Sequence, residues 1–223
     1  MIADLMDKIG RNVPLTSIEL HELRNEFRSM DEVKNLVKGW VQAGTSNPIF
    51  VPPMQVIYSK VLDADTASLT INIPSVYKHL LIMGKVRING SGGQVAVYLH
   101  AQFNGDAGGT NYQYGLLFHA GNTVAANYST GSNHVLFGYF AADGAGSGFA
   151  GASFLSIPHY QSSYYKTSLM IDGTSYASNV TTSIWQGLWK DTSPIRSITI
   201  FPDATYPSAK MESGSLFSIY GIL

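Results

Sequence analysis

From residue 54 onward, apolar residues alternate with polar ones, and this period of two is the strongest constraint on the fold. Leu69, Ile71 and Ile73 alternate with polar residues, and a full strand's length of alternation runs from Val95 to Phe103. Successive side chains of a strand point to opposite faces, so the pattern predicts half-buried β-strands. We expect strands near residues 55–62, 69–73, 78–89, 95–103, 112–119, 134–141, 148–160, 164–172, 181–189, 195–201 and 214–222.

Turn-forming residues separate these segments. They occur at Asn89–Gly93, Asn104–Gly109, Asp143-Gly144 and Asp172-Gly173, and in an Asn-rich break at 122–133 and a Pro-containing break at 202–208. About ten short strands with no helical pattern between them predict an antiparallel β-sandwich or jelly roll over residues 54–223. The last strand is apolar and has no polar tail, so we expect it to be docked in a sheet or against a partner chain.

Residues 1–47 have a helical pattern. A proline-containing linker that ends at residue 53 joins them to the β-domain. Thr16 and Glu19 form a capping box at the start of the main helix. The apolar positions that follow have coiled-coil-like spacing with one phase break. This seam either packs on the chain's own β-domain or drives self-association; its place before a linker favours self-association, as a homotrimer or alternatively a dimer. The seam comprises Leu20, Leu23, Phe27, Met30, Val33, Val37 and Trp40.

The composition is poor in charge. Charged residues make up 13% of the chain, about half the usual share, whereas there are 22 glycines and 13 tyrosines. Either the domain is a large sandwich with many turns, or other chains cover its surface. A net charge of −1 provides no basic field for nucleic acid. The sequence has no cysteine, no secretory-signal pattern at its start and no apolar run long enough for a membrane span.

Patterns of catalytic chemistry are weak. Ser163 and Lys166 match the spacing of a Ser-x-x-Lys motif, but that motif needs a helix and the flanking residues predict a strand. The six histidines lack the spacing of a metal site, and the aspartates of the β-domain lie in predicted turns. We therefore expect a protein that is not an enzyme, without a cofactor or metal.

Short motifs occur in a fixed order at Phe103–Asp106 with Asn111-Tyr112, Ser153–Tyr160, Tyr165–Thr167, Gly187–Trp189 with Ile195–Ile200, and Gly214–Ile222. In this order they resemble those of small structural proteins of tailed bacteriophages. The resemblance covers about residues 75–223, and the chain departs from the family pattern at Pro158 and Ile219. The resemblance implies a jelly-roll virion protein of a tail or head appendage. The lack of a secretory-signal pattern predicts synthesis in the host cytoplasm. The resemblance does not cover the N-terminal segment, which we expect to attach to other virion proteins.

Three roles fit this resemblance and composition. An appendage protein binds a host-surface glycan; a capsid- or tail-decorating protein stabilises the particle; a lectin-like carbohydrate-binding module acts alone. Loops rich in Asn, Gly, Tyr and Ser suit sugar recognition, which predicts ligand loops at 104–114 and 122–134. The candidate ligand residues are Asn104, Asp106, Tyr112 and Tyr114, whereas Trp189 is expected to be a core anchor.

Overall fold

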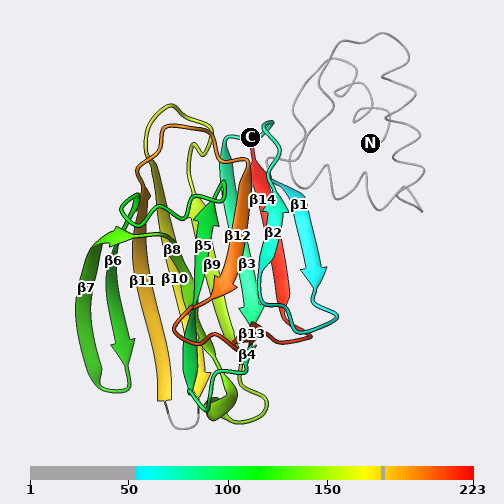
Figure 1. Ribbon diagram of the computed structural model, residues 1–223, viewed down its shortest axis with the longest axis vertical. Helices are drawn as coiled ribbons and strands as arrows, with labels where there is room; N and C mark the ends of the chain where they lie inside the picture. The colour runs from blue at the N-terminus through cyan, green and yellow to red at the C-terminus, as the bar shows by residue number, and fades with distance from the viewer. Residues whose placement is uncertain (1–53, 177–178) are drawn as a thin grey trace, which may run out of the picture. The chain divides into compact units, whose positions relative to one another are not determined.

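The computed structural model describes residues 54–176 and 179–223, and these form an antiparallel β-sandwich (Figure 1). The predicted fold class is therefore confirmed. The larger sheet has eight strands, and its spatial order mixes early and late parts of the chain. In that order the strands are β1 (Met54–Val61), β14 (Leu216–Ile222), β3 (His79–Val86), β9 (Gly151–Ile157), β10 (Lys166–Tyr176), β11 (Asn179–Trp189), β6 (Tyr112–Ala120) and β7 (Thr123–Ser132).

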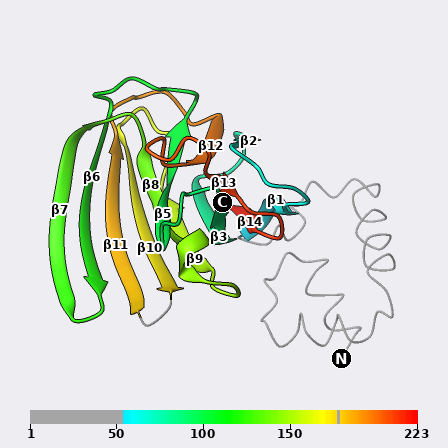
Figure 2. The same ribbon diagram turned by 60° about the horizontal axis from the view of Figure 1, so that its bottom comes forward.

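The smaller sheet packs inside the curve of the larger one. Figure 2 shows β7, β6 and β11 as a wall on one side of it. A two-stranded ladder and one short 3-10 helix, Asp143–Ala145, complete the described part of the chain. The smaller sheet contains, in order, β2 (Leu69–Asn72), β12 (Ser197–Pro202), β5 (Ala96–Phe103) and β8 (Val135–Ala141), and the ladder pairs β13 (Lys210–Met211) with β4 (Ile88–Asn89).

The hydrophobic core lies between the two sheets and follows the predicted alternation. Ile82 and Leu155 from the larger sheet and Leu99, Phe137 and Ile198 from the smaller sheet are all 0% exposed. Each such side chain contributes roughly 1.5–3 kcal/mol on burial, so these inward positions hold the sandwich together.

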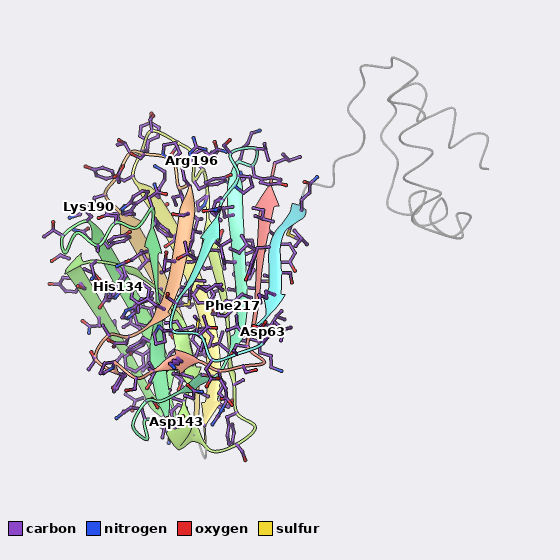
Figure 3. All side chains as sticks on the ribbon, turned by 45° about the vertical axis from the view of Figure 1, so that its right-hand side comes forward. Asp63, His134, Asp143, Lys190, Arg196 and Phe217 are labelled. Atoms are coloured by element: carbon purple, nitrogen blue, oxygen red, sulfur yellow. The ribbon has the colours of Figure 1, made fainter. Side chains whose placement is uncertain are left out.

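The final strand is an interior strand of the larger sheet, next to the edge strand β1. β14 lies between β1 and β3 and pairs with both, and its Phe217 and Ile219 are 0% exposed. Phe217 is labelled in Figure 3 near the start of this strand. The expectation that the apolar last segment is docked in a sheet is confirmed.

Two predicted breaks are wrong. The Asn-rich segment 122–133 contains strand β7, which pairs with β6 along its length and forms one edge of the larger sheet. Asp172 and Gly173 lie inside β10, opposite Ser183 and Thr182 of β11, instead of in a turn. In both cases, pairing with a neighbouring strand outweighs the local preference of these residues for turns.

Several expectations concern residues outside the described range. They are the helical segment 1–47, its boundary with the linker, and the seam from Leu20 to Trp40. Among the residues that the structure describes, no helix has the length and apolar character needed to cross a membrane.

Candidate functional site

The predicted ligand loop after β5 is bound tightly to the rest of the sandwich. Asn104 adopts a left-handed conformation (φ 54°), which suits the Asn-Gly turn that follows the strand. Its Oδ1 accepts hydrogen bonds from the backbone N–H groups of Arg196 (2.6 Å) and Ser197 (3.2 Å). Its Nδ2 donates to the carbonyl oxygen of Pro194 at 2.9 Å. The Asn104 side chain therefore joins β5 to the segment that leads into β12.

Asp106 is also occupied by contacts within the chain. Its carboxylate accepts hydrogen bonds from Nε1 of Trp189 at 2.7 Å, the N–H of Gly108 at 2.9 Å and Nδ2 of Asn111 at 3.0 Å. Burial alone would raise the pKa of Asp106, but these hydrogen bonds lower it below its usual value. The carboxylate thus fixes the loop against Trp189.

Tyr112 lies in the core, which corrects its prediction as a ligand residue. The side chain is 0% exposed, and its hydroxyl accepts a hydrogen bond from the N–H of Phe103 at 2.9 Å. Its ring stacks on Trp189 with centroids 6.3 Å apart. Tyr114 is half-buried and packs edge-on against Trp185 at 5.8 Å. The second predicted ligand loop, 122–134, is largely strand β7.

Lys166 is a buried cation beside the same tryptophan. Its Nζ donates to the carbonyl oxygens of Tyr164 (2.7 Å) and Asp191 (3.3 Å) and lies 5.8 Å from the centroid of the Trp189 ring. Burial lowers the pKa of Lys166, and the nearby Asp191 opposes that shift. Lys166 is the first residue of strand β10 and Ser163 precedes that strand, so the helix that a Ser-x-x-Lys site requires is absent here.

A cleft of about 130 Å³ opens at the opposite end of β11 from Trp189. Thr181 and Trp189 are eight residues apart on one strand, or roughly 27 Å. Five aromatic side chains, three of them tyrosines, line the cleft together with a threonine and a serine, and none of its lining residues carries a formal charge. The lining residues are Tyr98, Phe118, Ala120, Tyr139, Tyr176, Thr181, Ser183 and Trp185.

The aromatic rings of the cleft support one another. The ring of Tyr98 lies 4.6 Å from that of Tyr139 and 5.7 Å, edge-on, from Trp185. Burial raises the pKa of Tyr98, and it raises the pKa of Tyr139 to about 12. Both hydroxyls therefore stay protonated at neutral pH and are available as hydrogen-bond donors.

A buried carboxylate lies behind the cleft. Asp172 accepts hydrogen bonds from the hydroxyl of Ser183 and, at 2.5 Å, from the N–H of Tyr139. Burial raises the pKa of Asp172, while these bonds and the indole of Trp185 oppose the shift. Trp185 Nε1 nevertheless has no hydrogen-bond partner of good geometry. Because Ser183 donates its proton to Asp172, its oxygen lone pairs can accept a hydrogen bond from a ligand hydroxyl.

Sequence analysis did not find this cleft. Its residues come from five strands, and only the register of the sheets brings them together. One signal was present: Trp185 and Trp189 are four residues apart in a predicted strand, so both face the same side. That spacing predicts a shared aromatic face without saying which part of it stays accessible.

The sequence predicts single histidines, whereas the structure brings four of them into two pairs. The rings of His79 and His159 meet edge-on with their centroids 4.6 Å apart. His100 and His134 stack with their ring centroids 3.5 Å apart. Burial, with a further contribution from His134, lowers the pKa of His100 to about 3, and burial lowers the pKa of His134 to about 4. Across residues 54–176 and 179–223, no three His, Cys, Asp or Glu side chains are grouped to hold a metal ion.

Comparisons with known proteins give no family. No protein-family model matches the sequence, and no curated protein matches it. Among solved structures, the chain is similar to Scytalido-glutamic peptidase with a TM-score of 0.24 and 9% sequence identity. The match covers 72% of this chain and 65% of the peptidase chain, so this chain spans just under two thirds of the peptidase's length.

Two further structures score lower. A legume lectin-like domain from Entamoeba histolytica has a TM-score of 0.19 at 8% identity, over 76% of this chain and 89% of that one. The CBM2 module of the evolved Dit of Lactobacillus casei BL23 phage J-1 has a TM-score of 0.16 at 11% identity, over 82% and 84%. Scores this low establish no common fold.

Proposed function

We propose that this chain is a structural protein of a tailed-bacteriophage virion, a component of a tail or head appendage, whose cleft binds a saccharide of the host surface. The virion assignment rests on the sequence motifs. The binding role rests on one observation, the uncharged cleft lined by five aromatic rings. Aromatic faces pack on the C–H faces of sugar rings, and hydroxyls on the same wall bond to sugar hydroxyls.

The placement of the motifs supports the virion assignment. Trp189 belongs to one of the segments that resemble phage structural proteins and contacts three others, through Phe103 and Asp106, Tyr112, and Lys166. Residues that recur together in a family are expected to share such a structural cluster, because a change in one disturbs the packing of the others.

The cleft favours a neutral saccharide over an acidic one. No lysine or arginine lines it to pair with a carboxylate or sulfate, and the nearest charged group behind its wall is the acidic Asp172. Tyr98 and Tyr139 can donate hydrogen bonds and Ser183 can accept one, whereas the Thr181 hydroxyl already donates to the hydroxyl of Tyr176 at 3.4 Å.

Binding of the intact chain to an array of bacterial surface glycans tests the role of the cleft. Phe118→Ala and Tyr176→Ala each remove a half-buried ring from the cleft, and we expect each to weaken binding about tenfold or more, equivalent to about 1.4 kcal/mol. Tyr164→Ala is the matched control, because Tyr164 is 79% exposed and lies outside the cleft. Equal binding by all three variants would refute the cleft as the site.

Membership of the particle needs a separate experiment. Mass spectrometry of particles purified from the phage whose genome carries the gene should detect the chain in stoichiometric amount. A lectin-like module that acts alone would be absent from the particles, although it would give the same glycan-array result.

A capsid- or tail-decorating protein is the second candidate. The observation that favours it is a broad apolar area on the outer face of the larger sheet, which a particle surface would cover. A decorating protein should raise the temperature at which particles release their DNA, and an adsorption protein should leave that temperature unchanged.

A further inference from the structure

Five large apolar side chains lie in one continuous row on the outer face of the eight-stranded sheet. The strand register pairs Met83 with Phe154, Phe154 with Ile171, Ile171 with Ile184, and Ile184 with Leu117. The sheet order places them on the consecutive strands β3, β9, β10, β11 and β6. Their residues are 43%, 41%, 44%, 45% and 51% exposed, in that order. We call these five residues the apolar row.

The area around the apolar row is also uncharged. Leu169, Val124 and Tyr128 extend it on β10 and β7, with exposures of 49%, 68% and 76%. On strands β3, β9, β10, β11, β6 and β7, Lys85 is the one formally charged residue among those whose side chains point outward. An exposed protein surface is normally rich in charge, so this face has the character of an interface.

The dimensions of the face suit another sheet better than a helix. Six strands spaced about 4.8 Å apart span roughly 24 Å, and the outward residues of β10 extend over roughly 26 Å. The projected area is thus about 600 Å², close to the ~800 Å² that each partner buries in a standard interface. One helix is about 10 Å wide and would cover only about two of the six strands.

We propose that the apolar row is the contact between copies of this chain. A second copy presents a face of the same width, and two such faces can pack about 10 Å apart, as the sheets of a sandwich do. When two copies meet through the same face, charges on that face would repel their own copies. The uncharged face avoids this repulsion. A charged partner would find no complementary group, because Lys85 is at the margin of the area, on β3. This proposal does not depend on glycan binding by the cleft.

The absence of cysteine from the sequence allows a direct test on the full chain. Each position of the apolar row is changed singly to cysteine, and Val76→Cys is the matched control, because Val76 is 67% exposed in the loop between β2 and β3. The oligomeric mass is measured by light scattering, and disulfide-linked dimers are measured on non-reducing gels after mild oxidation.

We expect the wild-type mass to be at least twice the 24.2 kDa of one chain. We also expect at least one position near the centre of the row, Ile171 or Ile184, to cross-link several-fold more than Val76→Cys. A thiol at the centre of a self-contact lies close to its own copy, within the short reach of a disulfide.

Two results would overturn the proposal. One is a wild-type mass of 24.2 kDa, which would show that the chain is a monomer. The apolar row would then be covered by the chain's own N-terminal segment or by another protein. The other is an oligomer in which no row position cross-links above the control, which would place the contact elsewhere, such as at the seam from Leu20 to Trp40. Ile184→Lys gives an independent readout: it should lower the oligomeric mass and leave the circular dichroism spectrum unchanged, since Ile184 points away from the core.

Discussion

The indole Nε1 of Trp189 donates a hydrogen bond to Oδ2 of Asp106 at 2.7 Å and thereby joins segments 83 residues apart. The same indole stacks on Tyr112 at 6.3 Å, meets Phe103 edge-on at 5.6 Å and lies 5.8 Å from the ammonium of Lys166. Residues that look in the sequence like separate short motifs are thus one packed cluster. The first prediction concerns the hydrogen bond that closes it.

Asp106→Ala should lower the free energy of unfolding by about 1–3 kcal/mol, because it leaves the buried indole N–H of Trp189 without an acceptor. Urea denaturation measures the loss. The Trp189→Phe and double variants complete a cycle whose coupling energy should be about 1 kcal/mol or more.

Asp63→Ala is the matched control for this cycle. Its side chain is 83% exposed and forms a surface ion pair with Lys60 at 3.4 Å, so its removal should change stability by less than about 0.5 kcal/mol. Additive losses in the Asp106 and Trp189 cycle would show that the hydrogen bond does not couple the two segments.

Gly221 of β14 leaves no room for a side chain, and this supplies a second prediction. A Cβ there would lie 2.2 Å from Cγ and Cδ2 of Tyr77, atoms near the base of a half-buried ring whose hydroxyl donates to Gln55 Oε1 at 2.7 Å. Gly221→Ala should therefore lower the free energy of unfolding by about 1–3 kcal/mol.

Gly115→Ala is the control for this substitution, because it also lies in the larger sheet and a Cβ there meets no atom within 4 Å. It should leave the melting temperature nearly unchanged. Adding Tyr77→Ala to Gly221→Ala should recover part of the loss. A double variant with the summed loss of both single variants would exclude the steric explanation.

Period-two alternation was enough to predict most of the sandwich. Met170, Asp172 and Thr174 face inward on β10 while Leu169 and Ile171 face outward, as the pattern requires. Alternation does not indicate how far a strand extends past a turn-like pair, so it predicts an end for β10 at Asp172-Gly173, whereas the strand continues to Tyr176. It also fails where both faces of a strand are polar or exposed, which is why β7 was interpreted as a break.

The site was less predictable than the fold, because it depends on contacts between distant strands. The sequence places Tyr98 and Tyr176 in strands, but only the sheet order brings them into one cleft with Trp185. The loop at Asn104 suggested sugar recognition because its composition is polar and aromatic. In the structure its polar atoms are used within the chain, as the bonds of Asn104 to Arg196 and Pro194 show.

The interior position of β14 leads to a third prediction. Phe217 is 0% exposed and packs near Phe137, with ring centroids 6.0 Å apart. Phe217→Ala removes a fully buried ring and should cost about 3–5 kcal/mol, as measured by urea denaturation. Its neighbour Leu216 is 37% exposed on the other face, so Leu216→Ala should cost much less. Similar losses for both variants would contradict the assignment of Phe217 to the core face of β14 and Leu216 to its outer face.

The stacked histidines lead to the last prediction, on acid stability. The pKa values of His100 and His134 are about 3 and about 4 in the folded chain, below the ordinary 6.5. Between these values and 6.5 the unfolded chain binds more protons, so the stability from the neutral pair is complete above about pH 6.5 and is lost as the pH falls. Asp203 attracts the protonated forms and reduces the effect without reversing it.

From pH 7 to pH 5 the free energy of unfolding should fall by about 1–3 kcal/mol, measured by urea denaturation at each pH. His100→Phe keeps an aromatic ring beside His134 and removes one titrating group, so its stability should fall less over this range. An equal fall in the two proteins would mean that other groups cause the acid sensitivity.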